Sequence, residues 1–200
     1  MPISIVTAAF SAKYLDSVWD GIKRQTFKEW EWVFVIDGSA EAEEWYNKQD
    51  FTGYNVWKIK IDKNQKRYGL VSRNVGAMCA SYNWILFNDD DNHLEEDDYI
   101  EEIVRVYHET GKYPYTRLHI VGKKPGSTVD RYKDTSLSRT HIDLGNLLYR
   151  KEWFLRTGYF SDEKNHIVFD ADKIEDIVNL IGVDNFIKVD RHLYFRHKRY

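Results

Sequence analysis

The chain runs from four apolar residues, Trp84-Ile85-Leu86-Phe87, directly into a polar segment, Asn88-Asp89-Asp90-Asp91-Asn92. A short apolar run that stops at turn-forming residues predicts a buried strand followed by a loop. Three adjacent carboxylates repel one another, and their oxygens suit Mg²⁺, Mn²⁺ or Ca²⁺ better than zinc. The loop lacks the glycine and glutamate spacing of an EF-hand. A solvated acidic turn is the structural alternative, but the position directly after a buried strand favours a cation site.

Strands and helices alternate along the first half of the chain. Further strands are predicted at residues 3–6, 32–36 and 56–61. Helices are predicted between the strands and after the last one, at residues 15–22, 40–48, 70–82 and 100–107. This order, in a chain of 200 residues, predicts a single α/β domain. We expect a Rossmann-like, mostly parallel central sheet flanked by helices.

Polar residues follow three of the predicted strands. Thr7 ends the first strand, Asp37 ends the second, and Asp89 to Asp91 follow the strand at residues 84–87. In parallel α/β sheets, ligands bind outside the carboxyl ends of the strands. We therefore expect these residues to meet at one ligand-binding edge.

The second half of the chain is less regular. The polar segment from Gly122 to Thr140 predicts a mobile loop. Residues 142–149 predict a strand, and residues 153–155 a short helix. Asp170 is expected at the N-cap of a further helix that ends before Gly182.

Composition excludes several classes of protein. Lys plus Arg number 29 and Asp plus Glu number 32, for a net charge of -3, which argues against a nucleic-acid partner. The sequence has neither a run of about 18 apolar residues for a membrane span nor the pattern of a signal peptide. One cysteine, Cys79, excludes an internal disulfide framework. We expect a soluble cytoplasmic protein, and peripheral association with a membrane is also compatible with the sequence.

A set of short motifs recurs in a known order and spacing. Between residue 3 and about residue 100, the chain resembles the family 2 inverting glycosyltransferases of GT-A fold. The resemblance weakens beyond that point and returns in four short segments of the second half. The motifs are Ile5 to Phe10, Gln25-Thr26-Phe27, Ile36 to Ser39, Ser72-Arg73-Asn74-x-Gly76, Phe87 to Asp91, Leu148-Tyr149-Arg150, Gly158-Tyr159-Phe160, Phe169 to Asp172 and Tyr194 to His197.

The resemblance implies a nucleotide-sugar site in about residues 1–100 and an acceptor and catalytic half in about residues 101–200. Thr7, Ala8, Ala9 and Asp37 resemble the pocket for the uracil and ribose of a UDP-sugar. Arg73 resembles a partner of the nucleotide from the following helix. The family has two acids where this chain has Ile36-Asp37.

The acidic turn resembles the DxD motif of this family. By that resemblance, Asp89 and Asp90 bind the donor, and Asp91, together with Asp89, holds Mn²⁺ or Mg²⁺ against the diphosphate. His197 lies where some relatives supply a third metal ligand, and His192 is a weaker alternative.

The resemblance also implies the catalytic base. Asp170 lies at the position of the base, and Asp172 is the second choice because the usual Glu-Asp is Phe169-Asp170 here. The implied activity is the metal-dependent, inverting transfer of a sugar, with glucose as the default, from a UDP-sugar to a hydroxyl group. The acceptor is a glycan, a lipid or a protein. The short acceptor region would fit a catalytic domain of a longer chain.

Three alternatives compete with this interpretation. A HAD-like phosphohydrolase carries its Asp-x-Asp after the first strand, which here ends in Thr7. A sugar nucleotidyltransferase needs a glycine-rich basic loop where this chain has Ala8-Ala9-Phe10-Ser11. A non-catalytic module that binds a divalent cation or a sugar leaves Asp170 and Arg73 without a role.

Overall fold

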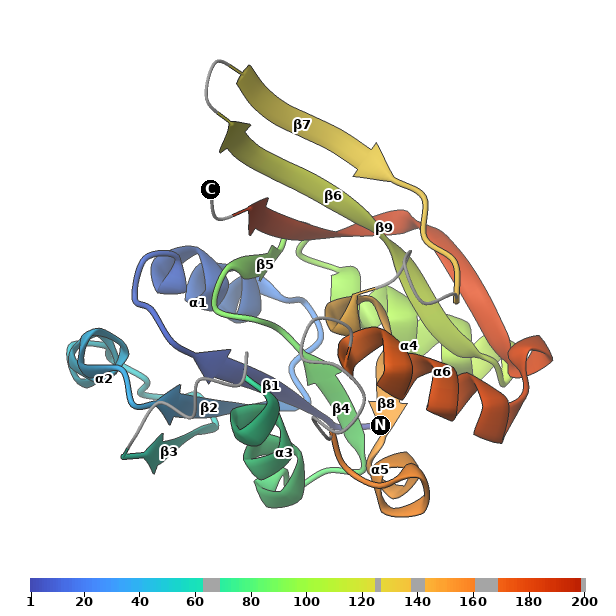
Figure 1. Ribbon diagram of the computed structural model, residues 1–200, viewed down its shortest axis with the longest axis horizontal. Coiled ribbons are helices and arrows are strands. Elements are labelled where there is room, and N and C mark those ends of the chain that lie inside the picture. Colours follow the sequence, from blue (N-terminus) through green and yellow to red (C-terminus); the bar gives the residue numbers. More distant parts are fainter. Residues whose placement is uncertain (63–68, 125–126, 138–142, 161–168, 199–200) are drawn as a thin grey trace.

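The computed structural model describes residues 1–62, 69–124, 127–137, 143–160 and 169–198 (Figure 1). A five-stranded sheet in the order β3-β2-β1-β4-β8 forms the centre of the described fold. β1, β2, β3 and β4 are mutually parallel, and β8 pairs antiparallel with β4. The strands are β1 (Ile3–Ala9), β2 (Trp30–Asp37), β3 (Val56–Ile61), β4 (Trp84–Phe87) and β8 (Leu148–Arg150). This arrangement confirms the predicted α/β fold with a mostly parallel central sheet.

Helices cover both faces of this sheet. One apolar cluster joins α1, α2 and α4 to one face of β1 and β2, and a second joins α3, α5 and α6 to the opposite face. Alternate residues of β2 enter the two clusters, as expected for a strand buried on both sides. The helices are α1 (Leu15–Arg24), α2 (Ala40–Asn47), α3 (Leu70–Cys79), α4 (Tyr99–Thr110), α5 (Lys151–Thr157) and α6 (Phe169–Ile181), with short 3₁₀ turns at Leu144–Asn146 and Val183–Asn185. Within the described ranges, no helix is both long and apolar enough to cross a membrane.

A second sheet of four strands, in the order β5-β9-β6-β7, was not predicted as such. Its strands are β5 (Asn92–Leu94), β6 (Tyr113–Lys124), β7 (Ser127–Lys133) and β9 (Phe186–Lys198). β6 and β7 form an antiparallel hairpin that extends to the top of Figure 1. The prediction of a loop from Gly122 to Thr140 is therefore wrong for residues 122–124 and 127–133, whereas residues 134–137 do form a loop. The sequence of this segment is polar and has no period-two apolar pattern, so backbone pairing alone reveals these strands.

The predicted strand at residues 142–149 is also corrected. The described part begins with a 3₁₀ turn, and the strand itself covers only β8. The side chain of Asp143 accepts a hydrogen bond from the amide of Gly145, and the side chain of Asn146 bonds back to the amide of Asp143. This capping arrangement favours a helical turn, which explains why an apolar run here is not one continuous strand.

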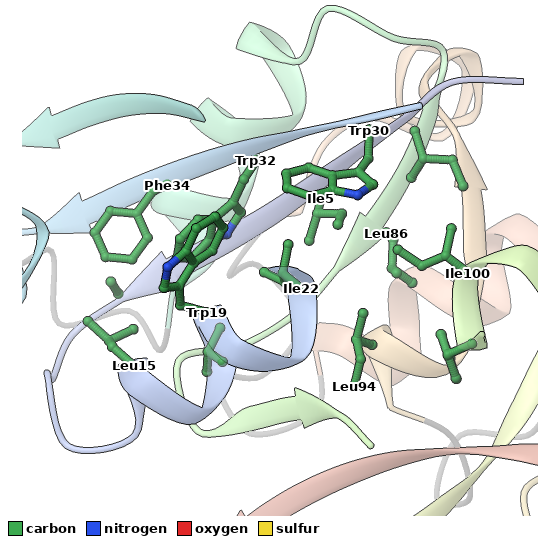
Figure 2. Packing of buried hydrophobic residues seen from close by; sticks show 14 of the residues in the cluster. Ile5, Leu15, Trp19, Ile22, Trp30, Trp32, Phe34, Leu86, Leu94 and Ile100 are labelled. Carbon is green, nitrogen blue, oxygen red and sulfur yellow. The ribbon is translucent and has the colours of Figure 1, made fainter. Parts of the chain in front are cut away.

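Aromatic side chains fill the core between α1 and the central sheet. Figure 2 shows Trp19 and Trp32 face to face, and their ring centroids lie 5.2 Å apart with an interplanar angle of 3°. The indole N–H of Trp32 donates a hydrogen bond to the hydroxyl of Thr7 at 2.9 Å. The tryptophan side chains thus pack in the core, and the hydrogen bond from Trp32 fixes Thr7 near the carboxyl end of β1, close to the predicted site.

Gly76 allows α3 to lie unusually close to β1. A Cβ atom at this position would stand 2.3 Å from Cγ1 of Val6, closer than real contacts allow. The close approach brings the first turns of α3, with Ser72, Arg73 and Asn74, to the carboxyl ends of the strands.

Candidate active site

The three predicted polar stretches meet at the carboxyl edge of the central sheet. β1 lies between β2 and β4 and runs parallel to both. The segments that follow these strands therefore emerge side by side at one edge. They contain Phe10 and Ser11, Asp37, and the acidic turn from Asn88 to Asn92.

Asp90 connects the acidic turn to the loop after β1. Its Oδ2 accepts hydrogen bonds from the backbone N–H of Phe10 at 2.8 Å and of Ser11 at 2.9 Å. The side chain is almost fully buried, and charge-assisted bonds of this kind are stronger than neutral ones. Asp90 therefore fixes the backbone beside the predicted nucleotide pocket.

Asp89 forms a forked ion pair with Arg73 of α3. Nη2 of Arg73 lies 2.7 Å from each carboxylate oxygen of Asp89, and Nε lies 3.1 Å from Oδ1. The side chains are only 7% and 16% exposed. We predicted Arg73 as a partner of the nucleotide. In this structure its guanidinium contacts the carboxylate of Asp89.

Asp37 is held by α3 as well. Oγ of Ser72 donates a hydrogen bond to Oδ2 of Asp37 at 2.8 Å, and both residues are buried. The two acids after β2 and β4 are therefore fixed by adjacent residues of one helix. Sequence reasoning identified Arg73 and missed Ser72, although the motif Ser-Arg-Asn contains both.

The side chains of Thr7, Ala8 and Ala9 lie in the core, with at most 1% of their surface exposed. The Thr7 hydroxyl accepts the hydrogen bond from Trp32. The side chains of these three predicted pocket residues are therefore part of the core. The next two residues, Phe10 and Ser11, are half-buried and lie nearer the surface.

Asp91 follows the two fixed acids and is half-buried. β5 starts at the next residue, and Asn92 pairs with Arg196 of β9 in antiparallel register. Asp91 itself lies in the turn before β5, and His197 directly follows Arg196 on β9. His192 lies beside the irregular step between the pairs Thr116–Val189 and Arg117–Leu193, away from the acidic turn. The side chains of both histidines lie outside the described residues.

The donor set of the acidic turn fits a hard cation. Asn88 and Asn92 flank the three acids, and their carboxamide atoms are buried without a hydrogen-bond partner in the described structure. Buried polar atoms without partners are rare and point to a water molecule, an ion or a ligand. Among the described side chains, no group of three or more His, Cys, Asp and Glu is arranged to hold a metal.

The two candidate bases lie in the first turn of α6. The helix begins at Phe169, so the expectation of Asp170 at its N-cap is wrong, because Asp170 is already the second helical residue. Asp170 shares its face with Ile174 and Ile177, which enter the core. Asp172, half-buried, shares its face with the exposed Glu175. The side chain of Asp170 lies outside the described residues.

A mostly parallel α/β sheet with an acidic turn at the carboxyl end of β4 agrees with the GT-A fold that the sequence resembles. The chain belongs to glycosyl transferase family 2, whose model matches residues 4–162. The resemblance found in the sequence is thereby confirmed. The acidic turn follows β4 and not β1, which agrees with this family and not with the HAD-like alternative.

Solved structures of S. aureus TarS share the fold. The crystal structure of its residues 1–349 matches with a TM-score of 0.75 at 17% identity, over 98% of this chain and 60% of that chain. The same fragment in complex with UDP matches at 0.72 and 18% identity, over 99% and 61%. Its complex with UDP-GlcNAc matches at 0.73 and 17% identity, over 100% and 59%. The chain thus spans about 60% of the length of these fragments. No curated protein sequence matches the chain significantly.

Proposed function

We propose that the chain is a metal-dependent, inverting glycosyltransferase that uses a UDP-sugar donor. The observation that carries the proposal is the preorganised acidic turn. Arg73 holds Asp89, the loop after β1 holds Asp90, and Asp91 follows at the same edge of the sheet. The TarS complexes with UDP and UDP-GlcNAc support a uridine nucleotide as the donor group.

Mn²⁺ or Mg²⁺ is the proposed cofactor. Asp91 would hold it, with Asp89 and His197 as further ligands. When bound, the ion neutralises the charge that develops on the departing diphosphate. Asp91 is the principal protein ligand in this scheme, as the resemblance to the DxD motif implies.

Asp170 is the proposed catalytic base, and Asp172 stays the second choice. The carboxylate accepts the proton of the acceptor hydroxyl while that oxygen attacks the anomeric carbon opposite the departing UDP. The start of a helix stabilises a negative charge, which favours the ionised base at neutral pH. Asp170 is preferred because the resemblance places the base at this position, which falls in helical register with the core residues Ile174 and Ile177.

The donor sugar and the acceptor are proposed only as classes. Glucose is the default donor, and the complex of TarS with UDP-GlcNAc makes N-acetylglucosamine the second donor to test. The acceptor supplies a hydroxyl group from a glycan, a lipid or a protein. The cytoplasm is the proposed compartment, in keeping with the exposed free thiol of Cys79.

Calorimetric titration with UDP, with and without Mn²⁺, tests the proposal on the parent and on Asp91→Asn. We expect binding that strengthens with Mn²⁺ in the parent and loses that dependence in the variant. Asp170→Asn should then bind UDP as the parent does but transfer sugar about 10²- to 10⁴-fold more slowly, the usual contribution of a general base. A parent that binds no UDP under any metal condition would refute the proposed function.

A further inference from the structure

Three consecutive residues of α3 contact three different segments of the site. Ser72 donates to Asp37, Arg73 pairs with Asp89, and Asn74 contacts the backbone of Phe160. Successive residues of a helix point about 100° apart, so one helical turn can reach three directions. The first two contacts fix the donor side of the site. The third leads toward the helix that carries the proposed base.

Asn74 and Phe160 form a reciprocal pair of hydrogen bonds. Nδ2 of Asn74 donates to the carbonyl oxygen of Phe160 at 2.9 Å, and Oδ1 accepts from the N–H of Phe160 at 2.9 Å. A carboxamide of this length meets both needs of a peptide group at once, whereas a carboxylate can only accept. The pair is partly buried, which shields it from competing water.

Lys173 connects α6 to Thr157 and Gly158, just before Phe160 in the chain. Its side chain is 5% exposed, and Nζ donates to the carbonyl oxygens of Thr157 at 3.1 Å and Gly158 at 2.8 Å. These carbonyls end α5 and lie two or three residues before Phe160. The stretch 157–160 is thus bound by α3 through Asn74 and by α6 through Lys173.

We propose that Asn74 is a positioning residue that sets the first turn of α6, and Asp170 in it, relative to the donor turn. The inference rests on the proposed role of Asp170. Asn74 follows Arg73 directly on a rigid helix, so the Asp89 contact and the Phe160 contact keep a fixed separation. A base must lie within hydrogen-bond reach of the acceptor hydroxyl, and a shift of about 1 Å in such a group costs on the order of 10²-fold in rate.

The test compares Asn74→Ala and Asn74→Asp with Asn185→Ala. Asn185 donates to the carbonyl oxygen of Ile181 at 2.7 Å, so its variant loses a similar hydrogen bond at the far end of α6. Three measurements are made on each protein: amide hydrogen exchange of residues 169–176, the Kd for UDP with Mn²⁺, and kcat for transfer from UDP-GlcNAc and UDP-glucose.

We expect Asn74→Ala to exchange faster at residues 169–176, to bind UDP within about twofold of the parent, and to lose on the order of 10²-fold in kcat. Asn74→Asp, which keeps one of the two hydrogen bonds, should recover part of that loss. Asn185→Ala should leave kcat and the exchange of residues 169–172 unchanged.

Two results overturn the inference. Unchanged exchange in both Asn74 variants means that Asn74 does not position α6. Faster exchange with unchanged kcat means that the position of α6 does not govern the reaction. A parent that neither binds UDP nor transfers sugar instead overturns the proposed function and, with it, any role in positioning a base. If Asn74→Ala does not fold, the same three measurements on Asn74→Asp decide whether the inference holds.

Discussion

Replacing Arg73 by methionine removes the guanidinium from Asp89 and keeps most of the side-chain volume. Removing one partner of a buried ion pair costs about 3–5 kcal/mol, because the remaining charge stays buried. Asp89 is 16% exposed and keeps some contact with water, so we expect the lower end of this range. A loss of about 3 kcal/mol lowers the unfolding midpoint of a domain of this size by roughly 6–12 °C.

Denaturant unfolding followed by circular dichroism measures this effect in the parent, Arg73→Met, Asp89→Asn and the double variant. Once Arg73 is gone, neutralising Asp89 removes the unpaired charge, so the double variant should lose less stability than the two single losses added. We expect a difference of about 1.5 kcal/mol or more, within the range of coupling energies for residues in contact. Additive losses, or a cost of less than about 1 kcal/mol for Arg73→Met, would refute the view that this pair holds the acidic turn.

Three further predictions concern packing, pH and metal. Gly76→Ala should destabilise the fold by about 1–3 kcal/mol, measured by thermal unfolding, because the added methyl group overlaps Val6; no loss would mean that α3 can move away at no cost. Burial raises the pKa of Tyr99 far above its usual 10.0. Above pH 10 the phenol of Tyr99 ionises in the unfolded chain but stays neutral in the folded protein, so the free energy of unfolding falls as the pH rises further. The parent should therefore lose stability above pH 10 more steeply than Tyr99→Phe, and equal slopes would contradict this. Removing metal with EDTA should leave the fold intact, since Asp89 and Asp90 have protein partners, whereas Mn²⁺ at 100 times its Kd should add about 2.7 kcal/mol of stability, which Asp91→Asn should lose. Unfolding on metal removal would contradict that expectation.

The central sheet could be predicted because its strands are buried on both faces. β1, β2 and β4 contain mostly apolar runs, at residues 3–6, 32–36 and 84–87, that are each followed by a polar residue, and this pattern predicts parallel strands and their ligand edge together. The second sheet lacks such a pattern. β5 has three residues, and β7, Ser127–Lys133, does not alternate apolar and polar positions. Its pairing with β9 joins segments more than 70 residues apart, which local sequence does not encode.

The residues of the site were easier to predict than their partners. The positions of Asp37 and Asp89 to Asp91 follow from strand ends, and Arg73 was found through its motif. That Ser72 binds Asp37, or that Asn74 binds Phe160, depends on the orientation and depth of α3 against the sheet. Gly76 allows the close approach of α3 to β1. In the sequence, this glycine was recognised only as part of the motif that contains Arg73.

Two of the three adjacent carboxylates of the acidic turn have partners that offset the repulsion between them. Asp89 is neutralised by a guanidinium, Asp90 by two backbone N–H groups, and these partners come from α3 and from the loop after β1. The turn therefore holds α3 and the loop after β1 together at the carboxyl edge of the central sheet. Asp91 is the last residue before β5, so it lies where the chain passes from the central sheet to the second sheet. In the proposed function, a cation held by Asp91 would therefore lie between the proposed nucleotide site and the sheet that carries β9.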